Sequence, residues 1–153
     1  MDIKIPLAEK LRPRDLDEYI GQQHLLGENA AFRKLLDSGN IHSMIFWGPP
    51  GVGKTTLALI IANATHRGFF QLSAINSGVK DIREVIESAK QEQTQPILFI
   101  DEIHRFSKSQ QDSLLNAVEK GIIILIGATT ENPSFEVISP LLSRCQVYTL
   151  QSL

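Results

Sequence analysis

The sequence predicts an α/β fold in which a parallel sheet lies between layers of helices, and three observations lead to this prediction. Short apolar runs alternate with segments of helical periodicity along the chain. The apolar runs show no alternation with polar residues, as expected for strands covered on both faces. A glycine-rich loop at residues 48–55 separates one such run from the helical segment that follows it.

Five strands and four helices account for most of the chain. The expected strands are residues 44–47, 69–72, 97–100, 122–128 and 146–150. The helix after the glycine loop has apolar residues at i, i+3, i+4 and i+7, which indicates one buried face. These residues are Leu57, Ile60, Ile61 and Ala64. The later helices are expected to begin at caps formed by Asp81 with Glu84, Ser109 with Asp112, and Ser139 with Pro140.

The composition limits the class of protein. A chain of 153 residues is expected to form one domain with a sizeable core. The net charge of −2 gives no basic field, so charge supplies no argument for nucleic-acid binding. The single cysteine, Cys145, offers no disulfide and fits a reducing compartment. The longest aliphatic run, residues 122–126, is too short to span a bilayer, and residues 1–4 open no signal peptide. We therefore expect a soluble intracellular protein.

The N-terminal segment is read differently from the rest. Residues 3–21 predict an extended arm followed by a short helix, because prolines disfavour helix before them. A second helix is expected at residues 29–36. The basic and acidic side chains of the arm are interleaved, which favours a solvated surface over a nucleic-acid patch.

The loop at residues 48–55, GPPGVGKT, matches the phosphate-binding pattern G-x-x-x-x-G-K-[ST] between a strand and a helix. Its glycines let successive backbone N–H groups turn toward one centre, and the helix N-terminus adds partial positive charge. Lys54 is expected to reach the β- and γ-phosphates, and the Thr55 hydroxyl to bind Mg²⁺. The residues expected to contact nucleotide here are Gly48, Pro49, Pro50, Gly51, Val52, Gly53, Lys54, Thr55 and Thr56.

Two carboxylates follow the third strand directly. Since ligands bind at the carboxyl ends of parallel strands, Asp101 and Glu102 are expected to face the crevice of the glycine loop. Asp101 is suited to hold Mg²⁺ and Glu102 to polarise an attacking water. The alternative, a surface acid pair, is weaker because the two motifs require each other.

The fourth strand ends in polar residues. Thr130 is the first candidate to hydrogen-bond the γ-phosphate or the attacking water, and Asn132 is the second. Threonine is also common in strands for packing reasons, so the residues alone leave both readings open. Read alone, Arg144 is a surface arginine and Cys145 a small buried hydrophobe. The four histidines lack ligand spacing, so no metal beyond nucleotide-bound Mg²⁺ is expected.

Together, the motifs GPPGVGKT, LFIDEIHR, GATTENPSFEV and LLSRC resemble those of an AAA+ ATPase of the clamp-loader group. Within that group the chain is most similar to the replication-associated recombination protein A family, over residues 7–150. The resemblance implies a P-loop NTPase three-layer sandwich with strand order 5-1-4-3-2. It also implies a nucleotide-binding core at residues 22–153, preceded by an adenine-contacting arm at residues 1–21.

The resemblance assigns roles that the residues alone do not. Thr130 becomes sensor 1, and Arg144 becomes an arginine finger acting on ATP held by a neighbouring subunit. Ser73 matches a position where relatives place a polar residue that restrains the catalytic glutamate. The residues matching the adenine-contacting segment are Leu11, Arg12, Pro13, Ile20 and Gly21.

The implied function is an ATPase using ATP/ADP and Mg²⁺ in replication-fork maintenance, recombination and repair. The implied partners are single-stranded or forked DNA, single-stranded-DNA-binding protein and further copies of the chain in a tetramer. The implied location is the bacterial cytoplasm near the nucleoid, without membrane contact. The helical lid and oligomerisation region of such proteins lie beyond these residues, so weak activity is expected from this chain alone. The alternatives are a Holliday-junction branch-migration motor and an ATP-gated scaffold in which hydrolysis is incidental.

Overall fold

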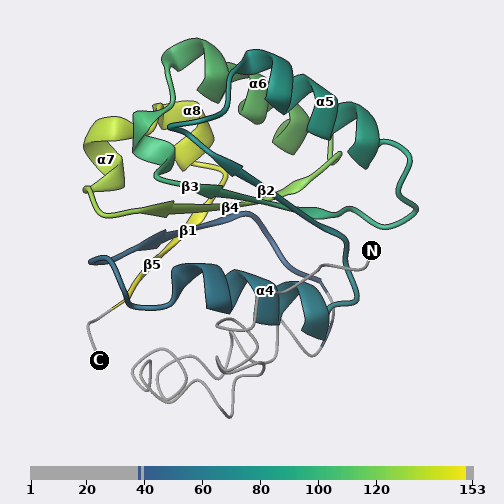
Figure 1. The fold of residues 1–153 in the computed structure, drawn as a ribbon, viewed down its shortest axis with the longest axis horizontal. Helices are drawn as coiled ribbons and strands as arrows, with labels where there is room; N and C mark the ends of the chain where they lie inside the picture. The colour runs from purple at the N-terminus through teal and green to yellow at the C-terminus, as the bar shows by residue number, and fades with distance from the viewer. Residues whose placement is uncertain (1–37, 39, 151–153) are drawn as a thin grey trace.

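The computed structural model describes residue 38 and residues 40–150 (Figure 1). Within this range, the strands are β1 (Met44–Trp47), β2 (Phe69–Ser73), β3 (Ile97–Asp101), β4 (Ile124–Thr129) and β5 (Gln146–Thr149). The helices are α4 (Lys54–Ala64), α5 (Val79–Ala89), the 3₁₀ turn η2 (Ile103–Arg105), α6 (Lys108–Glu119), α7 (Pro133–Glu136) and α8 (Ser139–Leu142). The expected alternation of strands and helices is confirmed.

The five strands form one parallel sheet with the order β2-β3-β4-β1-β5. This is the predicted order 5-1-4-3-2 read from the other edge, so the fold prediction is confirmed. β4 lies between β1 and β3, with Trp47 opposite Thr129 and Ile100 opposite Gly127. The strands that precede the glycine loop and the Asp101–Glu102 pair therefore end at the same edge of the sheet, on either side of β4.

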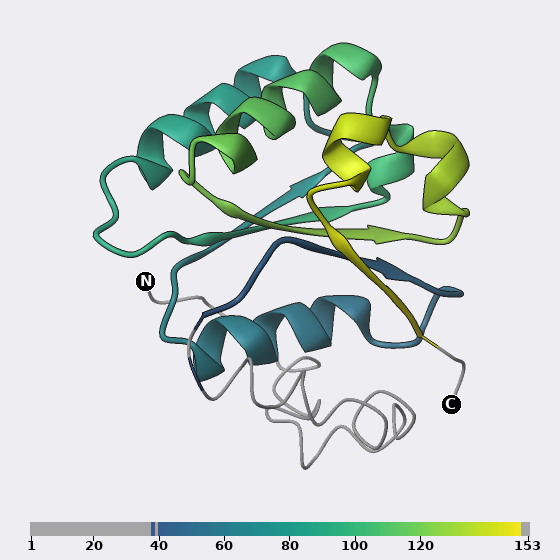
Figure 2. The same cartoon turned by 180° about the vertical axis from the view of Figure 1, so that it is seen from behind.

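Helices cover both faces of the sheet. Of the helices in the described part of the chain, α4 is the one under one face, whereas α5, α6, α7 and α8 lie over the other, as both views show (Figures 1 and 2). Alternate residues of β1 point to different layers: Met44 and Phe46 pack with the apolar face of α4, and Ile45 packs with the core under α5 and α6. All three side chains have no exposed surface, which explains why the strand sequences are apolar without alternation.

Two expected helix caps were wrong. α5 begins at Val79, and its third residue, Asp81, accepts a hydrogen bond from the Gly78 N–H at 2.7 Å. α6 begins one residue after Ser107, whose hydroxyl accepts from the Gln110 N–H at 3.2 Å, rather than at Ser109. In both cases the true capping pair lies two or three residues earlier and has the same i, i+3 spacing, so local pattern alone did not select between them.

Smaller differences concern element ends. β4 begins at Ile124, two residues later than expected, and Ser139 is the first residue of α8 rather than its cap. Ala64 is exposed at the last turn of α4, so the buried face of that helix ends earlier than the apolar spacing suggested. The 3₁₀ turn η2 and the one-turn helix α7 were not expected.

The expected N-terminal arm and the helix at residues 29–36 lie outside the described residues. Among the helices described, none is long and apolar enough to cross a membrane.

Candidate functional site

The loop between β1 and α4 has the backbone shape that its glycines permit. Gly51 and Gly53 have φ angles of 83° and 88°, in the left-handed region that side chains other than glycine rarely adopt. Gly53 is also the residue that precedes the first turn of α4. The loop therefore turns sharply and leads directly into a helix N-terminus, where an anion is stabilised by the helix dipole.

Gly48 is needed at the start of the loop because the chain passes very close to β5. Its N–H donates to the Thr129 carbonyl at 3.1 Å. A Cβ atom at this position would lie 2.7 Å from the Leu150 carbonyl oxygen, closer than real contacts allow. The first motif glycine thus serves the packing of three strand ends, a role that the motif pattern did not indicate.

The Lys54 side chain bends back over the loop that precedes it. Its Nζ donates to the Gly48 carbonyl at 2.6 Å and to the Pro49 carbonyl at 3.3 Å. Burial lowers the pKa of Lys54, and the negative charges of Asp101 and Glu102 oppose this by raising it. The ammonium group thus lies among oxygen acceptors and within electrostatic reach of both carboxylates, and a phosphate oxygen would offer it the same kind of acceptor.

Asp101 ends β3, and Glu102 follows in an unusual backbone conformation. Glu102 has φ 54° and ψ 47°, the left-handed region that costs a residue with a side chain about 1–2 kcal/mol. Asp101 and Glu102 lie at the edge of the sheet where the glycine loop begins, and the expectation that both carboxylates face its crevice stays a prediction. Strain of this kind is found at functional sites, where the surrounding structure holds it in place.

One oxygen of the Glu102 carboxylate is buried without a hydrogen-bond donor among the described residues. The Arg105 Nε lies 2.9 Å from this Oε2 and forms an ion pair with it, but the contact lacks the geometry of a hydrogen bond. The Arg105 side chain is 58% exposed, so solvent screens the charge of this ion pair. The Glu102 carboxylate is thus held on one side by a screened ion pair, and its Oε2 accepts no hydrogen bond from the described residues.

The tip of β4 lies between the ends of β1 and β3, as its candidate role requires. Thr130 is exposed and makes no side-chain hydrogen bond to another described residue. Asn132, the second candidate, already uses its Oδ1 to accept from the Ser134 N–H at 3.0 Å at the start of α7. The geometry favours Thr130 over Asn132 as a ligand-contacting residue, and its role stays a prediction.

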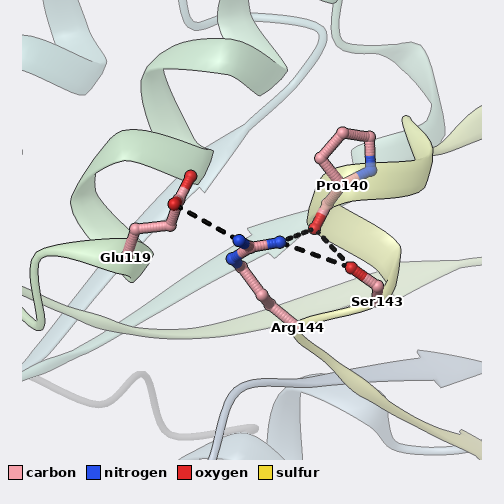
Figure 3. A network of polar contacts seen from close by, with 4 residues as sticks. All are labelled: Glu119, Pro140, Ser143 and Arg144. Atoms are coloured by element: carbon pink, nitrogen blue, oxygen red, sulfur yellow. Dashed lines mark hydrogen bonds and ion pairs between the residues drawn. The ribbon is translucent and has the colours of Figure 1, made fainter.

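Arg144 lies on the surface after α8 and is held by three contacts (Figure 3). One terminal nitrogen donates to the Pro140 carbonyl at 2.9 Å and to the Ser143 hydroxyl at 3.4 Å. The other lies 3.3 Å from a carboxylate oxygen of Glu119, at the end of α6. Its side chain is 42% exposed and that of Glu119 44%, and these three contacts come from α6, α8 and the residue after α8 rather than from the glycine loop.

The remaining candidates are placed as follows. Thr55 is half-buried in the first turn of α4, Thr56 is buried behind it, and Ser73 lies opposite Asp101 in the sheet register. The Ser73 hydroxyl accepts weakly from the Ile75 N–H at 3.4 Å. The predicted adenine-contacting residues lie outside the described residues. In the described part of the chain, His, Cys, Asp and Glu side chains form no group of three or more that could hold a metal ion.

One feature of the site was missed by sequence reasoning. The ring Nδ1 of His104 lies 2.8 Å from the hydroxyl of Thr129, and both residues directly adjoin predicted site segments. The histidines had been considered only as metal ligands. Closeness in sequence to the predicted site residues could have indicated this contact. His104 is two residues after Glu102, and Thr129 directly precedes Thr130.

Comparisons with known proteins agree with this arrangement. The family model described as "ATPase family associated with various cellular activities (AAA)" matches residues 44–153. Two bacterial relatives named replication-associated recombination protein A are similar over 151 residues, 97% of this chain and 34% of each relative. The protein from Haemophilus influenzae is 56% identical and that from Escherichia coli K12 is 55% identical. The chain thus spans about a third of the length of these curated relatives.

A solved structure supports the same fold. The Thermotoga maritima RuvB Holliday junction branch migration motor superimposes with a TM-score of 0.75 and 34% sequence identity, covering 93% of this chain and 48% of that one. The family model matches well over half of the chain and includes the glycine loop, the Asp101–Glu102 pair and Arg144. The chain therefore belongs to the ATPase family associated with various cellular activities, the AAA family.

Proposed function

We propose that this chain is the ATP-binding and Mg²⁺-dependent ATP-hydrolysing core of a protein that acts in replication-fork maintenance, recombination and repair. The observation that carries this proposal is geometric: the loop bent at Gly51 and Gly53 leads from β1 into the N-terminus of α4, and β3 ends at Asp101, directly before Glu102, at the same edge of the sheet. A lysine among oxygen acceptors, two carboxylates and a helix N-terminus are the parts that a phosphoryl-transfer site needs.

Each residue has a separate task in this proposal. Lys54 binds the β- and γ-phosphates in place of the loop carbonyls that it now contacts. The Thr55 hydroxyl and Asp101 hold Mg²⁺, which neutralises phosphate charge when bound. Glu102 accepts a hydrogen bond from the attacking water through its carboxylate, and Thr130 positions that water or the γ-phosphate. The position of Glu102 directly after Asp101, at the sheet edge where the glycine loop begins, supports this fit.

A second subunit completes the site in this proposal. Arg144 acts on ATP bound by the neighbouring copy and stabilises the charge that develops on the transferred phosphoryl group. The partial exposure of its side chain supports this role, because the guanidinium must be reachable by a nucleotide that another copy holds. Assembly into a homo-oligomer follows, and the tetramer and the adenine contacts from residues 11–13, 20 and 21 rest on the family resemblance.

The cellular role rests on the relatives rather than on the site. The names of the two bacterial relatives link them to replication-associated recombination. Work on DNA at replication forks, in the cytoplasm near the nucleoid, is part of the proposal and rests on the family resemblance. Single-stranded-DNA-binding protein is a further proposed partner. The second candidate is a Holliday-junction branch-migration motor, which the RuvB structural likeness favours. An ATP-gated scaffold needs no water-activating glutamate, so Glu102 weighs against it.

A chimera tests hydrolysis and DNA preference together. This chain replaces the corresponding 151 residues of the E. coli relative, which is feasible at 55% identity. The chimera is expected to hydrolyse ATP, Glu102→Gln to abolish turnover while keeping ATP binding, and Glu87→Gln, at an exposed site on α5, to change neither. Hydrolysis by Glu102→Gln at the wild-type rate would contradict the enzyme proposal. Strand displacement on four-way junctions exceeding that on forks would favour the branch-migration motor.

A further inference from the structure

Thr129 is a junction between the three segments proposed to act on ATP. It is the last residue of β4, in the middle of the sheet, and only 1% exposed. Its carbonyl accepts from the Gly48 N–H at 3.1 Å, which fixes the start of the glycine loop. Its hydroxyl accepts from the Glu131 N–H at 2.9 Å, which fixes the backbone on either side of Thr130.

The same hydroxyl also reaches the segment that carries Glu102. It lies 2.8 Å from Nδ1 of His104, in η2, and 3.2 Å from the Glu131 carbonyl. A hydroxyl offers one donor and two acceptor positions. It can therefore donate to the His104 ring, or accept from it while donating to Glu131, according to the ring tautomer. Either arrangement keeps the contact between η2 and β4.

His104 is not needed to satisfy the buried hydroxyl, because the Glu131 N–H and carbonyl can do that within the turn. The contact to His104 is therefore additional to the bonds within the turn, and it joins η2 to the end of β4. A second contact sets the distance between these elements: Ile103 is fully buried, and its Cδ1 would lie 2.9 Å from a Cβ at Gly127. Ile103 packing sets the spacing, and the His104–Thr129 contact sets the orientation.

We propose that the hydrogen bond between His104 and Thr129 positions Glu102 relative to Thr130 for attack of water on bound ATP. The inference rests on the proposed function. His104 and Thr129 are positioning residues, because they act through Glu102 and Thr130 rather than on the nucleotide. The bond also restrains η2 beside Glu102, whose left-handed backbone needs support from its surroundings. Misplacement of a reacting group by about 1 Å can cost about 100-fold in rate.

The test compares variants that remove the contact with variants that keep it. Thr129→Val removes the hydroxyl at nearly constant shape, and Thr129→Ser keeps it. His104→Ala removes the ring, and His104→Asn places an amide oxygen or nitrogen where Nδ1 lies. Thr65→Val is the control, because the Thr65 hydroxyl bonds only the end of α4, to the Ile61 carbonyl at 2.7 Å. All are made in the chimera, and single-turnover hydrolysis, ATP affinity and thermal unfolding are measured.

The expected pattern is a loss of rate without a loss of binding. Thr129→Val and His104→Ala each slow hydrolysis about tenfold, which corresponds to the free energy of one hydrogen bond and some misorientation of Glu102. ATP affinity stays within about twofold of the wild-type value. Thr129→Ser and His104→Asn recover most of the rate. The double variant is no slower than Thr129→Val alone, because Thr129→Val already removes the bond to His104 together with the two bonds to Glu131. Thr65→Val hydrolyses ATP at the wild-type rate.

Three results would overturn the inference: wild-type turnover in Thr129→Val, equal losses of rate and affinity, or additive effects in the double variant. These are distinguishable from failure of the proposed function. If Lys54→Ala loses ATP binding and Glu102→Gln loses turnover while Thr129→Val keeps the wild-type rate, only this inference fails. If Lys54→Ala binds ATP as the wild type does, the proposed function itself fails.

Discussion

Two regions are proposed to act on the same reaction: the glycine-loop corner, formed by residues 48–55 with the ends of β3 and β4, and the surface segment that carries Arg144. They differ in how many contacts within the chain hold them. In the corner, the ends of β1, β3 and β4 meet, and Lys54, Gly48 and Thr129 are joined by hydrogen bonds within the chain. Arg144 follows a one-turn helix at the surface, and its ion-pair partner, Glu119, is as exposed as it is (Figure 3). The corner is assembled from strand ends of one chain, whereas the task proposed for Arg144 requires a second copy.

Because of this difference, we expect ATP affinity and ATP turnover to respond to substitutions in different regions. Changes in the corner should alter ATP affinity or chemistry in any assembly state. Changes at Arg144 should leave affinity intact and act only where subunits meet. Three of the substitutions below lie in the corner, and two lie at Arg144 or its ion-pair partner.

Arg144→Ala should have the largest effect, and only on turnover in the assembled chimera. Arginine fingers contribute about 10³–10⁵ in rate, or roughly 4–7 kcal/mol of barrier. Steady-state ATPase measured with and without assembly checks this, alongside ATP affinity, which should stay unchanged. Lys90→Ala is the matched control, because Lys90 is an exposed basic residue directly after α5. Turnover at the wild-type rate in assembled Arg144→Ala would contradict the proposal that Arg144 acts on ATP bound by the neighbouring copy.

Glu102→Gln should lower turnover by about 10²–10⁴, the contribution of a positioned general base, while ATP stays bound. Because this residue acts within its own chain, the loss should be the same factor in assembled and unassembled protein. Single-turnover hydrolysis in both states measures it. A loss of turnover confined to the assembled protein would show that Glu102 acts only when a neighbouring copy is present.

Gly48→Ala should destabilise the fold by about 1–3 kcal/mol, the usual cost of overpacking. The added Cβ would meet the Leu150 carbonyl oxygen at 2.7 Å, so β5 must move away from the loop. Urea unfolding of the chain followed by circular dichroism gives the free energy of unfolding. Stability equal to the wild type would mean that β5 is not fixed against the loop.

Glu119→Gln should have the smallest effect. An exposed ion pair contributes about 0–1 kcal/mol, so the free energy of unfolding should change by less than about 1 kcal/mol. Turnover of the assembled chimera should change by no more than about fivefold, in contrast to Arg144→Ala. A loss as large as that of Arg144→Ala would mean that Glu119 is essential for orienting the guanidinium.

The sheet and the two main motifs could be predicted because their signals are local. Apolar runs such as residues 97–100 and the spacing of the glycine loop follow from burial on both faces and from backbone geometry. The helix caps were misplaced because competing i, i+3 pairs lie close together, as Ser107 with Gln110 and Ser109 with Asp112 show.

The finer geometry of the site could not be predicted for a different reason. His104 and Thr129 are 25 residues apart, and nothing in their spacing indicates that they touch. Their contact depends on β3 lying beside β4 and on the turn that Glu102 makes after its strand. The outward orientation of Arg144 likewise depends on where α8 packs, which the short motif around it does not determine.

Calorimetric titration of the 153-residue chain with Mg·ATP tests the central claim most directly, because it requires neither assembly nor turnover. The account predicts a measurable heat of binding for the wild type and for Lys90→Ala, and at least about 100-fold weaker binding for Lys54→Ala, since a buried charge-assisted contact to phosphate is lost. Equal affinity of the wild type and Lys54→Ala would contradict the assignment of the loop as the site of ATP binding.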